Sequence, residues 1–380
     1  MPSPLTMLSI GFVLCSGVFA IDPRQATPTS SDICSVTAYA AVPAATASCT
    51  SITLESINVP GDETLDLSKL KTGTTVTFAG TTTFDFFEGD YNLIEVGGTN
   101  ITITANPDAV IDGNGQAWWD GQGSNGGIAK PDHFFVVSKA LGNSVIKDLY
   151  IQNYPVHCFS ISGSAGLVME NIVLNNTAGN APNNRSAGLP AAHNTDGFDI
   201  SSSNDTVLRG STVVNQDDCV AVTSGDHITV SEMLCNGGHG LSIGSVGGKS
   251  DNNVTNILFE DSQILNSQNG ARIKTNSDTT GFIANITYRN IQVQNISIYG
   301  IDIQQDYLNG GPTGEPTNGV VIQNVTMTNI TGTAESDAKD YYILCGEESC
   351  SDFTFDDIGI VGGTNSSCNV LPEGDFSCSP

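Results

Sequence analysis

Three aspartates near the middle of the chain have the residue type and spacing for acid–base chemistry. Asp217 and Asp218 are adjacent in the segment NQDDC, and Asp196 lies earlier, in NTDG. Two carboxyl groups on either side of a sugar linkage are the minimal equipment for glycoside hydrolysis, because one protonates the leaving oxygen while the other activates water or attacks. Each segment alone is also a good solvated turn, so the interpretation depends on whether the fold brings the three together.

Short strands that recur along the chain must position these aspartates. The sequence has almost no helical periodicity and is rich in Val, Ile, Thr, Ser, Asn and Gly, a mixture typical of strands joined by turns. Segments such as FSIS, FDIS and VAVT align on seven apolar residues: Val137, Ile161, Ile200, Val222, Ile243, Ile273 and Ile303. A second strand series interleaves with the first. Repeats of roughly 20 to 50 residues without helices predict an all-β parallel β-helix of about ten coils rather than a β-sandwich.

The register of the repeat brings the chemically active residues into one row. Four residues before the aligned positions the chain carries, in order, His157, Asp196, Asp218, His239, Asn269 and Tyr299. Equivalent positions in successive coils lie about 4.8 Å apart, so Asp196, Asp218 and His239 are expected to be neighbours, with Asp217 one residue out of register. A bend near Gly197, Cys219 and Gly240 must turn these side chains outward. Crowding of three carboxylates predicts that at least one pKa is raised, keeping that group protonated as an acid.

A pair of basic residues is expected on the same face. Arg272 and Lys274 alternate with the inward Ala271 and Ile273, and should therefore face outward two coils beyond the aspartates. The chain has 13 Lys and Arg against 40 Asp and Glu, a formal charge of -27, which argues against a nucleic-acid partner. On so acidic a protein an anionic substrate needs local cations, although ordinary surface charge explains the pair equally well.

The amino terminus predicts export. The apolar run LSIGFVLCSGVFA is too short to span a bilayer and indicates a signal peptide over residues 1–20, followed by a short leader over 21–33 and one catalytic solenoid domain over 34–380. We therefore expect a secreted, extracellular monomer with no membrane partner. Glycosylation sequons fit export, although the motif is weak and asparagine is also common in turns; they include Asn100, Asn253, Asn285, Asn324 and Asn329.

The cysteines predict a disulfide framework. Of the ten cysteines, nine remain after the signal peptide, and short separations suggest four pairs: Cys34 with Cys49, Cys219 with Cys235, Cys345 with Cys350, and Cys368 with Cys378. Cys158 is left over and is expected to be an inert, partly buried thiol. The first and last pairs would stabilise the ends of the solenoid, where strand edges need caps. No cysteine or histidine spacing typical of zinc is found, so no metal is expected.

Four motifs together resemble the polygalacturonase family of pectin-cleaving glycoside hydrolases, and most of all its secreted fungal endo-acting members. They are NTDGFD at 194–199, QDDC at 216–219, GGHGLSIGS at 237–245 and RIK at 272–274. The resemblance spans essentially the whole mature chain. It implies a right-handed parallel β-helix, de-esterified homogalacturonan as substrate, inverting hydrolysis by a single displacement, and no metal or organic cofactor.

The resemblance also implies roles for the aspartates and their neighbours. Asp217 is the expected general acid, Asp196 and Asp218 are expected to activate the water, and His239 is expected to tune or orient the acid. An inverting mechanism needs room for that water between acid and base. Asn194 is expected to support Asp196 through a hydrogen bond.

Three further residues match the substrate-binding residues of the family. Arg272 and Lys274 are expected to hold a galacturonate carboxylate at the cleavage site. Tyr307, in the segment QQDY, matches a tyrosine that contacts substrate.

Other functions remain open at this point. Within the hydrolases, an exopolygalacturonase or a rhamnogalacturonan hydrolase would use a similar solenoid. A polysaccharide lyase would hold Ca²⁺ with clustered acids, although both basic candidates lie more than one repeat from the aspartates in sequence. A non-catalytic adhesin that binds polysaccharide would keep the repeat without needing three aligned aspartates.

Overall fold

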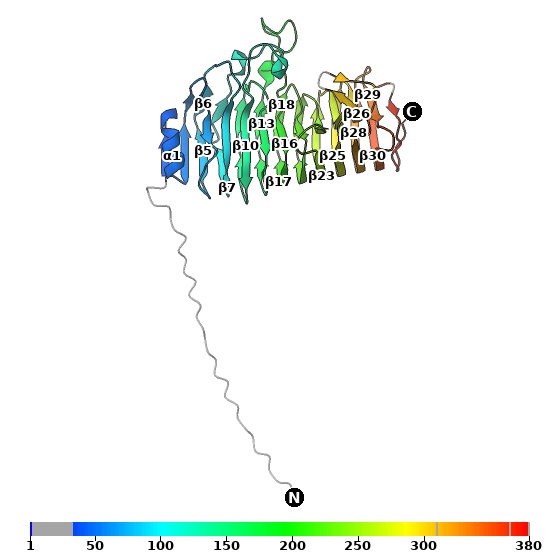
Figure 1. Cartoon of the computed structure of the whole chain (residues 1–380), viewed down its shortest axis with the longest axis horizontal. Helices are drawn as coiled ribbons and strands as arrows, with labels where there is room; N and C mark the ends of the chain where they lie inside the picture. Colours follow the sequence, from blue (N-terminus) through cyan, green and yellow to red (C-terminus); the bar gives the residue numbers. More distant parts are fainter. Residues whose placement is uncertain (2–32, 309–310, 365, 379–380) are drawn as a thin grey trace.

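The computed structural model describes residue 1 and residues 33–308, 311–364 and 366–378. The predicted signal peptide and almost all of the leader lie outside the described residues. The described strands stack into one elongated parallel β-helix, with the amino-terminal coils at one end and the carboxyl-terminal coils at the other (Figure 1). The solenoid is right-handed, as crossovers between parallel strands nearly always are.

One sheet carries the candidate site, and we call it the site sheet. Its strands pair in parallel with their equivalents one coil before and after, except for the short β27, which pairs antiparallel with β26. The strands are β4 (Leu65–Leu67), β7 (Asn92–Thr99), β10 (His133–Leu141), β13 (Phe159–Ser162), β16 (Phe198–Ser201), β19 (Val220–Val222), β22 (Leu241–Val246), β24 (Asn269–Asn276), β26 (Tyr299–Leu308), β27 (Gly311–Pro312), β29 (Lys339–Leu344) and β31 (Ser367–Cys368).

The remaining strands form the other faces of the solenoid. They are β1 (Ile33–Val36), β2 (Ser51–Glu55), β3 (Asn58–Val59), β5 (Thr75–Ala79), β6 (Thr81–Phe84), β8 (Thr102–Ala105), β9 (Val110–Asp112), β11 (Val145–Lys147), β12 (Tyr150–Gln152), β14 (Val168–Glu170), β15 (Val173–Asn175), β17 (Ser203–Arg209), β18 (Thr212–Asn215), β20 (Gly225–Ser231), β21 (Leu234–Gly237), β23 (Asn253–Leu265), β25 (Gly281–Ile296), β28 (Val320–Ala334) and β30 (Cys350–Val361).

Helices are few and short in the described chain. The helix α1 (Val42–Ser48), preceded by η1 (Tyr39–Ala41), lies at the amino-terminal end of the solenoid (Figure 1). Three single turns lie in the loops above the site sheet: η2 (Gly115–Ala117), η3 (Gly123–Asn125) and η4 (Thr177–Gly179). No helix among the described residues combines the length and the apolar character needed to cross a membrane.

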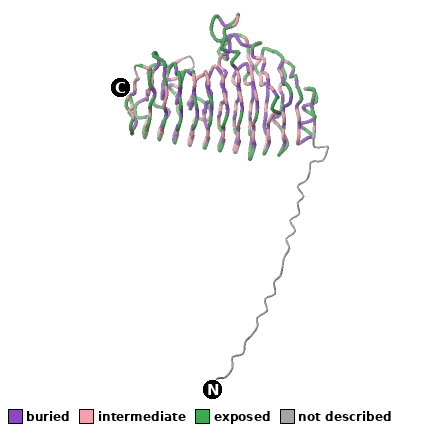
Figure 2. Tube along the Cα trace, turned by 180° about the vertical axis from the view of Figure 1, so that it is seen from behind, coloured by how far each residue is buried: buried purple, intermediate pink, exposed green. Residues whose placement is uncertain are grey.

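The predicted register of the repeat is confirmed. Val137 pairs with Ile161, Ile161 with Ile200, and Ile200 with Val222, and the same row continues to Ile303. All seven aligned side chains are buried, and buried segments recur in coil after coil along the solenoid (Figure 2). Behind the site sheet, Phe159 lies between Phe135 and Phe198, with ring centroids 4.7 and 5.1 Å away.

All four predicted disulfides are present. Cys34 and Cys49 join β1 to the residue after α1, and Cys368 and Cys378 join the last strand to the chain that follows it. The expectation of a partly buried Cys158 was wrong, because its side chain is fully buried. Cys158 lies three residues before the aligned Ile161, a position held in the following coils by Gly197, Cys219 and Gly240, where only small side chains fit inward.

Several sequon asparagines have left-handed backbone, and Asn285 and Asn324 do so within the long strands β25 and β28 rather than in turns. Asn324 donates to Asn285 (2.7 Å), Asn285 donates to Asn256 (2.9 Å), and all three have positive φ. Asn is tolerated in this conformation because its short amide bonds locally. The ladder of side-chain amides therefore joins successive coils of the solenoid.

Candidate active site

The predicted bend places the row of active residues in turns directly before three strands. The strands β16, β19 and β22 begin at Phe198, Val220 and Leu241, so Asp196, Asp218 and His239 each lie two residues before a strand. The turns are joined by backbone bonds, since Gly197 N donates to Asp218 O (2.9 Å) and Cys219 N donates to Gly240 O (3.0 Å). Because these residues lie outside the strands, the alternation of inward and outward side chains does not apply to them, and their side chains can point away from the core.

A buried asparagine fixes the turn that carries the adjacent aspartates. The Nδ2 atom of Asn215 donates to the carbonyl oxygens of Thr195 (2.9 Å), Asp217 (3.0 Å) and Asp218 (2.9 Å). Cys219, the next residue, is bonded to Cys235 on β21. Asn215 was not singled out from the sequence, although an asparagine two residues before a polar turn is a signal for such an arrangement.

Asp217 is the most heavily hydrogen-bonded carboxylate of the three. Its Oδ1 lies 2.9 Å from Nδ1 of His239 and accepts from Asp218 N (2.8 Å), and its Oδ2 accepts from Nδ2 of Asn194 (3.0 Å). Burial alone would raise the pKa of Asp217, but the charge and hydrogen bond of His239 hold it well below its ordinary value. The side chain is therefore ionised in the free protein.

The expected partner of Asn194 was wrong. Asn194 bonds to Asp217 rather than Asp196 because its side-chain oxygen Oδ1 is held by η3, where Ser124 N (3.1 Å) and Asn125 Nδ2 (3.2 Å) both donate to it. This contact also ties the loop of η3 to the catalytic turn.

Asp196 has the opposite environment. It is buried, and its Oδ1 lies 2.9 Å from Nδ1 of His157. Burial, followed by repulsion from Asp217 and Asp199, raises the pKa of Asp196 to about 7. The prediction that crowding raises at least one pKa is confirmed, but the raised group is not Asp217, the residue that the resemblance names as the acid. The difference arises because Asp217 accepts three polar contacts and Asp196 does not.

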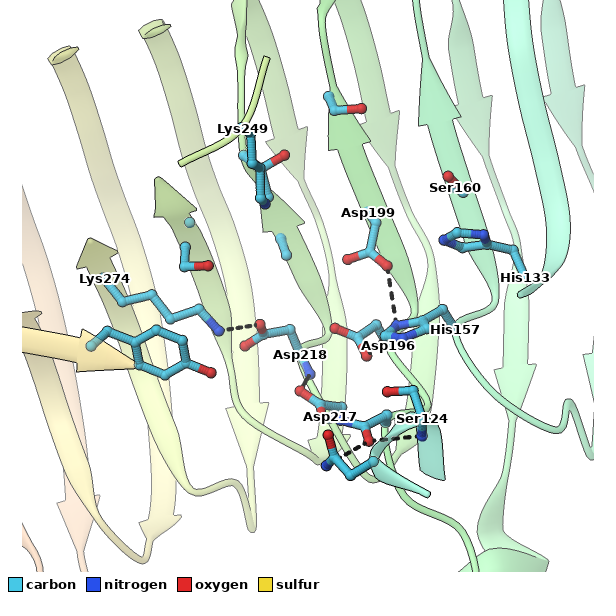
Figure 3. A pocket seen from close by; sticks show the side chains of 18 residues that line it. Ser124, His133, His157, Ser160, Asp196, Asp199, Asp217, Asp218, Lys249 and Lys274 are labelled. Carbon is cyan, nitrogen blue, oxygen red and sulfur yellow. Dashed lines mark hydrogen bonds and ion pairs between the residues drawn. The ribbon is translucent and has the colours of Figure 1, made fainter. Parts of the chain in front are cut away.

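Asp218 is paired with a cation from two coils away. Its Oδ2 lies 2.7 Å from Nζ of Lys274, and its Oδ1 accepts from Oγ of Ser242 (2.7 Å), as Figure 3 shows for the lysine. The two residues thus touch although they lie two coils apart, as expected from the sequence. The long side chain of Lys274 lies along the sheet and reaches back across the intervening strand β22.

The other basic residue also has an acidic partner. Arg272 Nε lies 3.0 Å from Oδ2 of Asp302, the residue directly beside it on β26. Burial raises the pKa of Asp302 to about 7, although Arg272 opposes this. Tyr307 lies next to both cations, with its ring centroid 5.7 Å from Cζ of Arg272 and 5.2 Å from Nζ of Lys274. Asp302 was not identified from the sequence. In the segment IDIQ it alternates with inward apolar residues, and it lies on the strand next to Arg272 and Lys274.

Four more polar residues of the site were not assigned from the sequence. His133, Asp199 and Lys249 line the same hollow, as does His157, which the register had placed in the row but to which no role was given. His133 could have been found by the same count, since it lies four residues before Val137. Asp199 could also have been found, because it directly precedes the inward Ile200 on β16 and therefore faces outward. Lys249 could not, because it lies in the loop after β22.

Two groups in the described chain have enough imidazole and carboxylate donors close together to hold a divalent ion. They are His157 with Asp196 and Asp199, and Asp217 with Asp218 and His239. These side chains already make ion pairs, within the first group, between His239 and Asp217, and between Asp218 and Lys274, and we assign no ligand role to them.

These side chains line a hollow of about 450 Å³ on the outside of the site sheet (Figure 3). The hollow contains all three aspartates together with Lys274 and Tyr307, and it shares Ser124, His133 and His157 with a second hollow of about 500 Å³ toward the amino-terminal coils. The groove therefore continues past the carboxylates on that side. His239 faces a different hollow, on the other side of Asp217.

Carboxylates paired in a groove along a parallel β-helix define a class of solenoids that process polysaccharides. Residues 49–378 match the family described as glycosyl hydrolases family 28, and the chain belongs to this family. It is therefore a glycoside hydrolase.

Several known relatives are similar along most of their length. The chain is 58% identical over 342 residues to the probable endopolygalacturonase D of Emericella nidulans, covering 90% of this chain and 66%, about two thirds, of that protein. It is 57% identical to a polygalacturonase of Fusarium fujikuroi, covering 94% of this chain and 96% of that one. Among solved structures, endopolygalacturonase I from Stereum purpureum, complexed with two galacturonate, has a TM-score of 0.77 at 30% identity and covers 90% of this chain and 99% of its own.

Proposed function

We propose that this protein is an endopolygalacturonase that hydrolyses α-1,4-galacturonosidic linkages in de-esterified homogalacturonan with inversion. The observation that carries the proposal is the juxtaposition of three buried aspartates with the Lys274 ammonium in one groove. Relatives described as polygalacturonases support it, as does the related Stereum purpureum structure that contains galacturonate. A groove that continues beyond the carboxylates suits cleavage within a chain.

Asp217 is proposed to deliver the proton to the leaving oxygen. In the free protein it is ionised and paired with His239, whose pKa is raised by the Asp217 carboxylate even though burial opposes this. The pair thus holds one proton. We infer that it passes from Nδ1 of His239 through the Asp217 carboxyl group to the glycosidic oxygen as the bond to the anomeric carbon breaks.

Asp196 and Asp218 are proposed to act on the water that attacks the anomeric carbon. Asp218 has both oxygens engaged, by Lys274 and Ser242, and is therefore suited to orient the water. Asp196 accepts no hydrogen bond at Oδ1 from the described residues, and takes the proton that the water releases. This step requires the ionised form of Asp196.

Lys274, Arg272 and Tyr307 are proposed to hold a substrate carboxylate. Lys274 and Tyr307 line the groove, whereas Arg272 lies behind them, against Asp302. A galacturonate carboxylate near Tyr307 would be attracted by both cations, which offsets the repulsion from an acidic protein surface.

The proposal extends to the setting of the enzyme. We propose that residues 34–380 act as a single secreted catalytic domain, working as a monomer on extracellular pectate, without a cofactor.

The proposal is tested by comparing wild type with Asp217→Asn on polygalacturonate. Wild type should release new reducing ends, and the variant should lose about 10²- to 10⁴-fold in kcat while still binding substrate. Addition of a chelator should change nothing. Unsaturated product ends, or loss of activity in chelator, would indicate a lyase. Binding without any cleavage by wild type would indicate an adhesin.

A further inference from the structure

Two histidines bracket the aspartates in the row before the site sheet. In register the row reads His157, Asp196, Asp218, His239, because Phe159 pairs with Phe198, Phe198 with Val220, and Val220 with Leu241. The family resemblance assigns a role to His239 alone. His157 occupies the same position in the coil at the other end of the row.

The two histidines make the same contact with different aspartates. Nδ1 of His239 lies 2.9 Å from Oδ1 of Asp217, and Nδ1 of His157 lies 2.9 Å from Oδ1 of Asp196. Among the described residues Oδ1 of Asp196 accepts no hydrogen bond, so the His157 cation is the group that compensates this buried oxygen. In Figure 3 the His157 ring lies directly beside Asp196.

The surroundings of His157 are charged on several sides. Asp199 on β16 lies 3.6 Å from Nδ1, and the ring of His133 at the start of β10 lies 5.6 Å away, centre to centre. His193, in the loop before Asp196, also senses the charge of His157, and Lys249 acts on Asp196 and Asp199 from beyond β22. The carboxylates of Asp196 and Asp199 lie 2.9 and 3.6 Å from Nδ1 of His157, which favours the charged imidazolium.

We propose that His157 is a positioning residue that keeps Asp196 oriented and ionised for its reaction with water, as His239 holds Asp217. The inference rests on the proposed function, in which Asp196 takes a proton from water. Two of the three catalytic carboxylates, Asp196 and Asp217, would then each have a histidine partner, one at each end of the row.

The electrostatics agree with this geometry. Asp196 is buried and repelled by two other carboxylates, and the charge and hydrogen bond of His157 are the interactions that lower its pKa. In turn, Asp196 and Asp199 raise the pKa of His157 well above its ordinary value, even though burial would lower it. Loss of the imidazolium should therefore leave Asp196 protonated over a wider pH range, in which it cannot accept a proton.

The test compares His157→Leu, which removes charge and donor, with His157→Asn, which keeps a neutral donor near the Nδ1 position. A matched control is His227→Asn, because His227 makes a similar ion pair with Asp226 (2.6 Å) on β20, outside the groove. The pH dependence of kcat/KM on polygalacturonate is measured for all four proteins. A ¹³C titration of the Asp196 carboxyl group in wild type and His157→Leu supplies a readout that does not need activity.

For His157→Leu we expect the acidic limb of kcat/KM to move up by about 1 to 2 pH units, mainly through kcat. This corresponds to a 10- to 100-fold loss below the limb and recovery above it. His157→Asn should shift less, and His227→Asn not at all. A uniform loss at every pH, or an unmoved limb in both variants, would overturn the inference. If wild type does not hydrolyse polygalacturonate, the proposed function fails, and an unchanged Asp196 titration would then separately reject the role of His157.

Discussion

The ammonium group of Lys274 lies 2.7 Å from the carboxylate of Asp218, although β22 lies between their strands. Both side chains are almost fully buried. In the proposed function, this contact links the carboxylates that act on the scissile bond to the cations that hold the substrate. A single lysine would then have two tasks, neutralising Asp218 and attracting a galacturonate.

Replacement of Lys274 by Met should affect stability and activity together. Removing one partner of a buried ion pair leaves the other charge uncompensated, which typically costs about 3 kcal/mol or more of unfolding free energy. We expect a loss of this size in denaturant unfolding and at least a 100-fold fall in kcat/KM. Arg209→Met is the control, since its pair with Glu170 is exposed and is worth about 1 kcal/mol or less. Equal stability of Lys274→Met and wild type would contradict the structural pairing.

Stability should fall as the solution becomes less acidic. The pKa values of Asp196 and Asp302 are both raised to about 7 in the folded protein, compared with an unfolded value of about 3.9. The folded state then binds more protons than the unfolded state between these values, so the free energy of unfolding decreases as pH rises through this window. Raised pKa values of His157 and His239 act in the same direction, because their stabilising protons are lost as pH rises.

The corresponding measurement is a series of thermal melts between pH 4 and pH 8. We expect a lower Tm at pH 8 than at pH 5, and a flatter dependence in Asp302→Asn, because its amide does not ionise. A Tm that rises across this range would mean that other carboxylates dominate.

The disulfide next to the aspartates should matter for catalysis as well as stability. Replacing Cys219 and Cys235 together by Ala removes the link that follows Asp218 directly. A bridge closing a loop of this size is typically worth about 2 to 4 kcal/mol, and kcat should fall because the turn loosens. The double Ala variant of Cys345 and Cys350, whose bridge lies in a distant coil, should keep its kcat. Equal kcat values for the two double variants would show that the turn does not need its bridge.

The aromatic stack behind the site sheet leads to a prediction about the stability of the core. Phe159 is fully buried between Phe135 and Phe198, and Phe159→Ala should lower the unfolding free energy by about 3 to 5 kcal/mol. Leu234→Ala is an exposed control and should change it by less than about 0.5 kcal/mol. Near-equal denaturation midpoints for these two variants would contradict the packing of the solenoid interior.

The sequence predicted which residues lie next to one another in the site better than it predicted their hydrogen bonds and ion pairs. A solenoid repeats one register along its length, so counting back from Ile200 and Val222 was enough to place Asp196 beside Asp218. The pairing of Lys274 with Asp218 could not be counted, because it depends on a flexible side chain that reaches across a strand. The hydrogen bond from Asn194 to Asp217 depends on the loop of η3, which has no counterpart in the repeat. The pKa is raised at Asp196 and lowered at Asp217 because of such contacts and burial, so this difference could not be predicted for the same reason.

The most direct test of the account is the size of the first products released from long-chain polygalacturonate. Cleavage inside the chain, in a groove that continues past Asp196, predicts that oligomers of intermediate length appear first and are shortened later. Saturated ends should be found on all of them, since the three aspartates hydrolyse the linkage with water. Release of monomer or dimer alone from the earliest times, with the polymer otherwise intact, would contradict endo-acting hydrolysis by this site.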